Sequence, residues 1–404
     1  MLSLQYIREK LEYFSQSQKT EQIGMKDLQD WIYDGDNLRH VTGGYFSVIG
    51  VHDANENNGL ILDQRETGLI GLFVHKRQDE TFFLLQYRCE PGLAKGCNLT
   101  TTVQATPSNY LVSHGGKETF GLKAILHSNS QNRIIFDSFD YDYGAFFLGK
   151  IKRFVVVELD EFIKPPEGFE WIPENLLRVA LHEDHMFSTD LRVMIGKYFS
   201  SLSNLVQDLV GFNPDSPLQV KDQHRRNKHV RIDSLRNIKV TESGITQCAP
   251  TLTPISEVSL FRSTSQSREI TVWTQPLLRL NCAPVVSLLR AHFAGQAYSL
   301  CQLRFEPGIN ALPILGPTHV NYLDGPENGN YAHPGITKIC DVLVSGEGAR
   351  FFQTDFRIQI FEDTKDCKLE APVGFIWVHD VDMQRIVSSA MSTSVELRYC
   401  LSLV

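Results

Sequence analysis

The sequence contains two copies of one pattern, and this repeat constrains the fold more than any other feature. Residues 86–92, QYRCEPG, recur as residues 302–308, QLRFEPG, at an offset of 216. Further matches follow in the same order, and the last pairs DLR at 190–192 with ELR at 396–398. A collinear series at nearly constant spacing predicts a tandem duplication of one unit of about 190 residues.

One match in this series needs a gap. GAFF at 144–147 aligns with Gly348-Ala349 and Phe351-Phe352 when one residue is inserted between the two pairs. Apolar runs bounded by turn residues predict strands at 43–51, 68–76, 81–91, 133–139 and 153–160. Helical spacing of apolar residues predicts helices at 3–15, 173–182 and 191–209. The predicted fold class is α/β, with each copy built from mixed β-sheets packed with helices.

These patterns also predict how the chain is divided. We expect an N-terminal helix at 1–19, a first domain at 20–210, a linker at 211–229 and a second domain at 230–404. The linker is expected because its residues are polar, include two prolines and carry a basic cluster. That cluster could also bind a phosphate or an RNA, but no aromatic residues that could stack on bases are interleaved with it.

Charge and composition exclude several classes of partner. The 39 basic and 47 acidic residues give a net charge of −8, which argues against general binding of nucleic acid or of an anionic membrane. The N-terminus lacks the features of a signal peptide, and no window reaches the ~18 apolar residues of a membrane span. We therefore expect a cytoplasmic protein. The eight cysteines form no CxxC pair, which favours buried, reduced thiols over a catalytic or metal-binding cysteine.

Common catalytic fingerprints are missing from the sequence. It contains no GxxxxGK[ST], no GxGxxG and no GxSxG, which removes P-loop and serine-hydrolase chemistry. The run His182-Glu183-Asp184-His185 could supply metal ligands, or it could form a polar turn between two helices. Because spacing places no third ligand, we expect no metal site.

The repeated motif and the segment after it provide candidate site residues. Gln86, Arg88 and Glu90 share one face of a strand, where they form either a pocket wall or an ion pair that holds the strand end. The stretch TVQATPSNY at 102–110, with His114, is rich in hydrogen-bonding groups and poor in charge. It suits recognition of a polyhydroxylated ligand, although it also reads as a turn-rich loop.

These residues belong to a larger set of motifs spread over the chain. The set is Trp31, His40, TGGYFSV at 42–48, Gln64, EPG at 90–92, VQAT at 103–106, SNY at 108–110, His114, WTQP at 273–276 and EPG at 306–308. In this order the motifs resemble the NDP-hexose 2,3-dehydratase family from about residue 20 to 404. The resemblance implies two Nudix-like domains per chain, a homodimer, and loss of water across C2 and C3 of dTDP-4-keto-6-deoxyglucose during deoxysugar biosynthesis for natural products. It also explains why the sequence lacks the carboxylate-rich helix with which Nudix hydrolases bind magnesium.

The implied reaction needs a base for the C3 proton, donors for the enolate oxygen and an acid for the departing C2 hydroxyl, but no cofactor. We expect Glu90 to be the acid or base, and His114 and Tyr110 to donate protons or stabilise the enolate. We expect sugar contacts from Gln64, Gln104 and Asn109, and diphosphate contacts from Arg88 and Arg153. The second-domain equivalents are Gln275, Arg304, Glu306 and Arg357.

Departures from the family pattern favour the first domain as the working site. The asparagine-rich stretch of the family appears as Lys152-Arg153-Phe154, and the second copy of the VQAT segment is scrambled over 318–331. A changed substrate is therefore an open alternative, as is dehydration or enolisation of another natural-product intermediate. A non-catalytic protein that binds nucleotide sugars or assists assembly is the other alternative.

Overall fold

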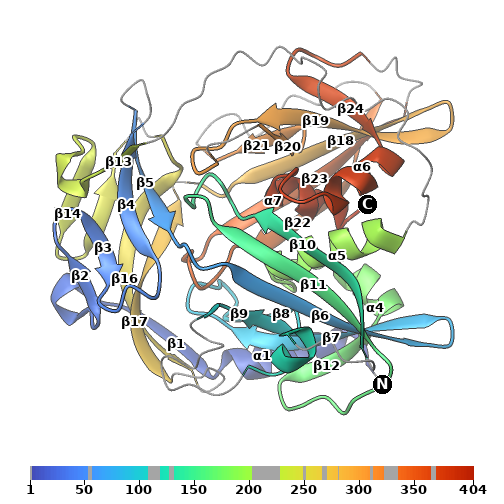
Figure 1. Cartoon of the computed structure of the whole chain (residues 1–404), viewed down its shortest axis with the longest axis horizontal. Coiled ribbons are helices and arrows are strands. Elements are labelled where there is room, and N and C mark those ends of the chain that lie inside the picture. The colour runs from blue at the N-terminus through green and yellow to red at the C-terminus, as the bar shows by residue number, and fades with distance from the viewer. Residues whose placement is uncertain are drawn as a thin grey trace.

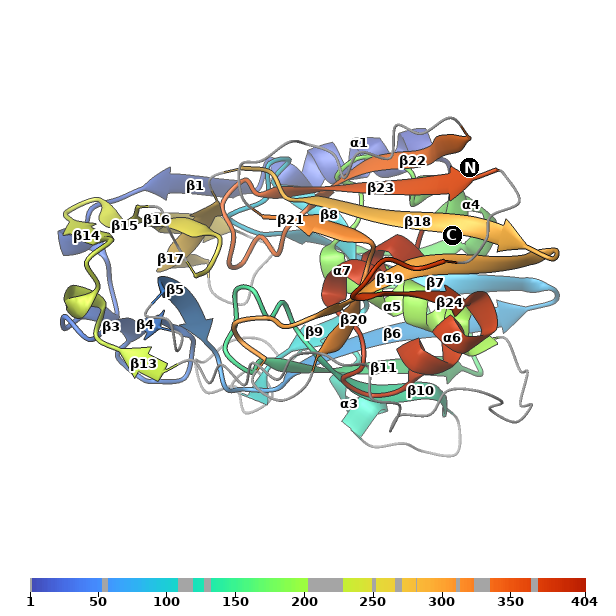
Figure 2. The same ribbon diagram turned by 90° about the horizontal axis from the view of Figure 1, so that it is seen from above.

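The computed structural model describes residues 2–52, 57–107, 119–126, 132–202, 228–248, 252–265, 271–280, 282–309, 313–322, 335–364 and 370–404. Two large sheets face each other with helices between them, and two smaller sheets lie together at one end of the molecule (Figures 1 and 2). None of the helices in these ranges is long and apolar enough to cross a membrane.

The first large sheet has seven strands and is mixed. Strands β11 and β6 are parallel, and the other pairs are antiparallel. The run GLIGLFV at the start of β6 is buried throughout, as expected for a central strand covered on both faces. The sheet order is β10 (Asn132–Tyr141), β11 (Ile151–Leu159), β6 (Gly68–Arg77), β7 (Glu80–Cys89) and β12 (Phe169–Pro173), with β8 (Cys97–Thr100) beside β7 and β9 (Val103–Ala105) beside β6.

The second large sheet repeats this topology strand for strand, again with one parallel pair, β18 and β23. The predicted tandem duplication and the α/β fold class are therefore confirmed. The order is β22 (Ile336–Ser345), β23 (Asp355–Asp363), β18 (Val285–Phe293), β19 (Gln296–Arg304) and β24 (Phe375–His379), with β20 (Ile314–Gly316) beside β19 and β21 (His319–Asn321) beside β18.

Helices follow the last strand of each large sheet. Helix α4 (Glu174–Ala180) starts after Pro173, as the sequence predicts, and α5 (Thr189–Leu202) covers most of the helix expected at 191–209, whose last residues lie outside the described ranges. Their counterparts are α6 (Asp380–Ser388) and α7 (Val395–Leu401). Helices α5 and α7 pack against each other between the two sheets (Figure 2). A short helix, α3 (Leu122–Leu126), contacts β11.

The two small sheets exchange strands between the halves of the chain. Strand β1 (Gln18–Gln22) pairs with β16 of the second half, whereas β13 (Lys228–Val230) pairs with β4 of the first half. Each half thus completes the small sheet of the other. Short 3-10 helices, Met25–Asp27 and Ile232–Ser234, follow the exchanged strands. The remaining strands are β2 (Trp31–Tyr33), β3 (Asn37–His40), β4 (Ser47–His52) and β5 (Asn58–Asp63) in one sheet, and β14 (Ile238–Thr241), β15 (Gly244–Gln247), β16 (Ile255–Ser265) and β17 (Val272–Leu280) in the other.

The N-terminal helix, α1 (Leu4–Ser15), packs against β7 and β8. Ser3 caps it by accepting a hydrogen bond from the backbone N–H of Tyr6, and the ring of Phe14 stacks on that of Tyr87 at 5.1 Å. The helix predicted at 3–15 is thus present. Residues 211–227 of the predicted linker lie outside the described ranges, and the predicted domain bounds stay a prediction.

The repeated EPG turns join the two halves. The Gly92 N–H donates to the Gly348 carbonyl at 2.8 Å, and the Gly308 N–H donates to the Gly144 carbonyl at 2.6 Å. A Cβ atom at Gly92 or Gly308 would lie 1.7 Å from a backbone carbonyl oxygen of the other half. These turns therefore require glycine because backbone of the opposite half lies against them.

The structure also corrects the gap placed in the GAFF alignment. Leu62 forms a bridge to Phe147 just as Leu278 forms one to Phe351, so the two loops have equal length and nothing is inserted. Arg350 consequently occupies the position of Phe146. The sequence could not show this because two adjacent phenylalanines can be aligned in either register.

A buried ion cluster reinforces the contact between the halves. Lys197 on α5 and Arg398 on α7 both pair with Asp140, at 2.6 and 3.0 Å, and all three side chains are fully buried. The Lys197 ammonium also donates to the Val387 carbonyl at 2.7 Å. Asp140 therefore links a strand of the first half to helices of both halves.

Candidate active site

Three of the predicted site residues, Arg88, Glu90 and Gln104, meet at one cavity of about 30 Å³ between the two halves. The cavity lies where β7, β8 and β9 end, beside the start of α5 and the loop after β22. It is lined by Arg88, Glu90, Asn98, Thr100, Gln104, Ser188, Thr189, Asp190, Gly346 and Glu347.

Glu90 is held beside Arg88, as expected from their positions two residues apart along an extended chain. The Arg88 Nε–H donates to Glu90 Oε1 at 3.0 Å, and both side chains are mostly buried. Gln104 donates from Nε2 to Thr100 Oγ1 at 2.7 Å and to Asp190 Oδ2 at 3.2 Å. The predicted pocket wall is thus polar and hydrogen-bonded.

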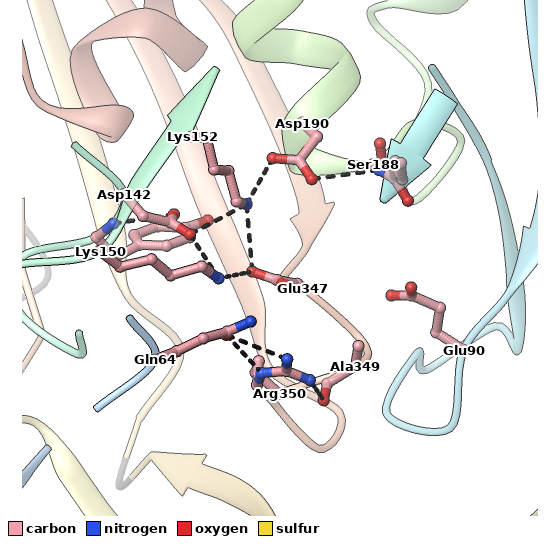
Figure 3. Close-up of polar contacts among 12 residues, drawn as sticks. Gln64, Glu90, Asp142, Lys150, Lys152, Ser188, Asp190, Glu347, Ala349 and Arg350 are labelled. Atoms are coloured by element: carbon pink, nitrogen blue, oxygen red, sulfur yellow. Dashed lines mark hydrogen bonds and ion pairs between the residues drawn. The ribbon is translucent and has the colours of Figure 1, made fainter. Parts of the chain in front are cut away.

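A cluster of five buried charged side chains borders this cavity (Figure 3). The Lys152 ammonium lies 2.7 Å from Asp190, 3.1 Å from Asp142 and 3.4 Å from Glu347. The Lys150 ammonium lies 2.9 Å from Asp142 and 3.6 Å from Glu347. Glu347 comes from the second half, so this cluster is assembled from both copies of the repeat.

Burial and these charges shift the pKa values of the carboxyl groups in different directions. Burial raises the pKa of Asp190 to about 6, since the pull of Lys152 does not fully offset it and Glu347 and Asp142 add repulsion. Burial also opposes ionisation of Asp142 and Glu347, but Lys150 and Lys152 outweigh it and hold both pKa values below their ordinary range. Asp190 is therefore the carboxyl of the cluster that titrates closest to neutral pH.

Gln64 belongs to the same region and binds a second residue of the other half. Its Oε1 accepts hydrogen bonds from Arg350 Nε at 3.2 Å and Nη2 at 3.1 Å. The Arg350 guanidinium also lies over the ring of Phe46, 4.3 Å from its centroid. Figure 3 shows Arg350 and Gln64 beside Lys150 and Glu347. The predicted sugar contact at Gln64 thus lies next to an arginine supplied by the second copy.

The equivalent place in the second half is aromatic rather than charged. At an offset of 204 residues, Lys150, Lys152 and Asp142 correspond to Thr354, Phe356 and Gly346, and Glu347 and Arg350 correspond to Tyr143 and Phe146. Tyr143 stacks on Phe356 at 5.3 Å, and the ring of Phe146 lies 5.2 Å from that of Tyr322. Only the first copy therefore assembles the charged cluster at this position.

In the second-half copy of the repeated motif, Glu306 is more deeply buried than Glu90, whereas Arg304 is as exposed as Arg88. Arg304 and Glu306 are 3.8 Å apart, and burial together with the nearby Glu396 raises the pKa of Glu306 to about 8. The Tyr322 hydroxyl donates to Glu396. Gln275 donates to the Ala349 carbonyl at 3.0 Å, directly before Arg350.

The two remaining predicted arginines lie elsewhere. Arg153 points to the face of β11 opposite Lys152 and pairs with Asp137 at 2.6 Å. Arg357 pairs with Asp341 at 2.8 Å in the same position of the second sheet. The structure therefore does not bring either arginine to the cavity, and the symmetric pairs explain why both copies have arginine there. The predicted Asn109, Tyr110 and His114 lie outside the described residues.

Sequence reasoning missed the charged cluster itself. The available signal was the spacing of Lys150, directly before β11, and Lys152, within it. Both are buried, and side chains two residues apart in an extended chain share a face. Asp190 lay within a repeated tripeptide but had no assigned partner. The missed residues are Asp142, Lys150, Lys152, Asp190, Glu347 and Arg350.

The alternative metal site at 182–185 has separate partners for its two histidines. His182 Nδ1 lies 3.5 Å from Cys340 Sγ, whereas His185 Nδ1 lies 3.0 Å from Ser345 Oγ and 3.3 Å from Asp355. Among the described residues, no three His, Cys, Asp or Glu side chains form a group that could hold a metal ion. This turn instead joins the first half to β22.

A sequence profile of the family described as NDP-hexose 2,3-dehydratase matches residues 4–197 and 221–404. The chain belongs to the NDP-hexose 2,3-dehydratase family. The match covers both copies of the repeat, and it starts at residue 4 rather than at about residue 20, where the resemblance places the start. The chain is therefore an enzyme, a dehydratase.

Three curated relatives carry the name dTDP-4-dehydro-6-deoxy-alpha-D-glucopyranose 2,3-dehydratase. The protein from Streptomyces violaceoruber is 26% identical, with 94% of this chain and 91% of the relative covered. Those from Amycolatopsis orientalis and Saccharopolyspora spinosa are each 24% identical, with 95% and 94% of this chain and 86% of each relative covered.

A solved ADP compounds hydrolase is 12% identical, with a TM-score of 0.22, and covers 40% of this chain and 80% of its own. At that score the likeness carries no argument. The fold class rests on the repeated sheets and on the family.

Proposed function

We propose that this dehydratase eliminates water across C2 and C3 of a dTDP-4-keto-6-deoxyhexose, in the biosynthesis of deoxysugars for natural products. The observation that carries the proposal is the asymmetry between the copies. The first half places carboxylates and amides around one cavity, with two lysines beside it. The second half keeps Arg304, Glu306 and Glu396 but has aromatic rings in place of Lys152, Glu347 and Arg350. The names of the three relatives support the choice of sugar nucleotide.

The residues of the cavity suit the chemistry of this elimination. A C4 ketone acidifies the C3 proton, so a carboxylate can remove it and leave an enolate that expels the C2 hydroxyl. Glu90 lines the cavity and serves as the acid or base, while Gln64 and Gln104 bind the sugar. Arg88 faces the same cavity and suits a phosphate or enolate oxygen.

Other predicted contacts remain part of the proposal. Tyr110 and His114 donate protons or stabilise the enolate, Asn109 binds the sugar, and Arg153 binds the diphosphate only if the ligand reaches the outer face of β11. A homodimer in the cytoplasm is the expected setting.

The test is incubation with dTDP-4-keto-6-deoxyglucose and an NADPH-dependent 3-ketoreductase, followed by mass analysis for the loss of one water. We expect turnover by the wild type and a reduction of at least ~100-fold in Glu90→Gln. Glu158→Gln is the control, because Glu158 pairs with the exposed Arg133 away from the cavity. dTDP should also raise the melting temperature by mass action. If the wild type shows neither dehydration nor a thermal shift at millimolar dTDP, the proposed substrate is wrong.

A further inference from the structure

Three carboxyl groups line the cavity, and the two from the first half, Glu90 and Asp190, lie on different elements and in different surroundings. Glu90 lies just after β7, and Asp190 lies in the first turn of α5. An elimination of water needs one group to remove a proton and another to supply one. The surroundings of the two carboxyls indicate which group does which.

Glu90 has a charged neighbour of its own. The Arg88 guanidinium donates to it at 3.0 Å, whereas Asp190 shares Lys152 with Asp142 and Glu347. A carboxyl group that faces the cavity beside its own cation is suited to accept a proton from carbon, and this is the role of a base.

Asp190 lies in surroundings that favour keeping a proton. It is buried, with 8% of its surface exposed. Lys152 lies against it from β11 and Gln104 from β9, while Asp142 and Glu347 repel it from the two neighbouring loops, and Arg88 and Glu90 face it across the cavity. The resulting pKa of about 6 leaves a usable protonated fraction near neutral pH.

We propose that Asp190 is the general acid that protonates the departing C2 hydroxyl, opposite Glu90 as the base. This inference rests on the proposed function. The C3–H bond breaks, its proton passes to a Glu90 oxygen, and its electron pair forms the enolate of the C4 ketone. The enolate electrons then form the C2–C3 double bond as the C2–O bond breaks. The Asp190 proton joins the departing hydroxyl, and one water leaves.

Conversion of the first product to its keto form restores the proton balance of the two carboxyl groups. The elimination leaves an enol at C3, which gives its hydroxyl proton to the ionised Asp190 and receives the Glu90 proton at C2. The product is a 2-deoxy-3,4-diketo sugar, and both carboxyls return to their starting forms.

Lys152 and Glu347 act as positioning residues for this acid. Lys152 fixes one oxygen of Asp190 at 2.7 Å and is itself held by Asp142 and by Glu347 of the second half. Through this contact the second copy supports a proton transfer in the first. Removing the negative charge of Glu347 removes a repulsion from Asp190 and should lower the pKa of Asp190.

The deciding experiment separates the two proton transfers. Wild type, Asp190→Asn and Glu90→Gln are incubated with dTDP-4-keto-6-deoxyglucose in D₂O, and exchange at C3 and loss of water are measured by mass and NMR. We expect Asp190→Asn to lose dehydration by at least ~100-fold while it still exchanges the C3 hydrogen. Glu90→Gln should lose both reactions. Glu396→Gln alters the equivalent carboxyl of the second half and should stay within about threefold of the wild type.

The pH profile gives a second readout that does not depend on the Asp190 variant folding. The acid works when protonated, so kcat/KM should fall as pH rises through about 6, and Glu347→Gln should move this limb to lower pH. The assignment is overturned if Asp190→Asn dehydrates within threefold of the wild type, if it loses exchange as well, or if the limb does not move. A wild type that neither exchanges nor dehydrates, and that dTDP does not stabilise, instead refutes the proposed function.

Discussion

Replacing Gly92 with alanine should separate the two halves locally, and the structure gives the size of the effect. The added Cβ would lie 1.7 Å from the Phe351 carbonyl oxygen and 2.7 Å from that of Gly348. Both obstacles are backbone, so no side chain can rotate away. Relief requires the turn to move by about 1.5 Å, because unstrained contacts between carbon and oxygen exceed roughly 3 Å.

Such a movement breaks two hydrogen bonds. The Gly92 N–H bond to Gly348 is 2.8 Å long, and the Gln353 N–H bond to Gly92 is 2.7 Å. Each contributes about 1 kcal/mol, and overpacking adds about 1–3 kcal/mol. We therefore expect Gly92→Ala to lower the free energy of unfolding by about 3–5 kcal/mol, which is a large part of the ~5–15 kcal/mol typical of a domain.

Urea denaturation followed by circular dichroism measures this loss, and the repeat supplies a matched variant. Gly308→Ala meets the Phe147 carbonyl at the same 1.7 Å, so its loss of stability should be similar. Turnover at low temperature should differ between Gly92→Ala and Gly308→Ala. Gly92 lies two residues from Glu90, which lines the cavity, whereas Gly308 contacts only the loop at 144–149 between Asp142 and Lys150. Gly92→Ala should therefore cause the larger loss of activity, by more than ~10-fold.

Gly24→Ala is the control, because the nearest atom to its added Cβ is 3.6 Å away. It should change stability by less than ~0.5 kcal/mol. The reasoning fails if Gly92→Ala is as stable as this control, or if Gly308→Ala reduces turnover as much as Gly92→Ala does.

Two further predictions concern buried ionisable groups. The pKa of Glu306 is raised to about 8 in the folded chain, so the folded state binds more protons than the unfolded state from about pH 4.5 up to 8, and this contribution to stability is lost as pH rises through 8. The melting temperature of Glu306→Gln, measured relative to the wild type at pH 5, 7 and 9, should therefore increase with pH. If the difference between the two melting temperatures is the same at all three pH values, the raised pKa of Glu306 is contradicted. Lys197→Met should cost roughly 3–5 kcal/mol in urea denaturation, because Asp140 loses one of its two buried cations. Lys239→Met, at an exposed strand position, should leave stability nearly unchanged.

The sequence predicts the large sheets well, because each strand is marked by its own apolar run and the whole pattern occurs twice. Apolar runs identify β6, β7, β10 and β11, and the recurrence of QxRxEPG shows that the second sheet has the same order. The exchanged strands could not be found in this way. Strand β1, QKTEQ, has no apolar alternation, and its partners in β16 lie 239 to 247 residues away. Strand β13 has only three residues and starts inside the predicted linker.

In the candidate site too, contacts between neighbouring residues could be predicted, whereas contacts between distant residues could not. Arg88 and Glu90 could be placed together because a strand has a period of two, and the repeat drew attention to them. Lys152 and Asp190 are 38 residues apart, and Lys152 and Glu347 are 195 apart. Their proximity follows from the packing of the two halves, which no local pattern encodes. The tyrosine and phenylalanine that replace Glu347 and Arg350 in the first copy have meaning only once that packing is known.

The exchange of strands β1 and β13 between the two halves limits how this enzyme can be divided into separate fragments for experiments. A fragment that ends before residue 228 would lack the strand that borders β4, and it would expose its own β1 with no neighbour to receive it. Open strand edges of this kind invite pairing with any available chain. Truncation is therefore a poor route to assigning activities to each copy. The two fragments should instead be co-expressed, because β1 of one polypeptide can then pair with β16 of the other, and β13 with β4.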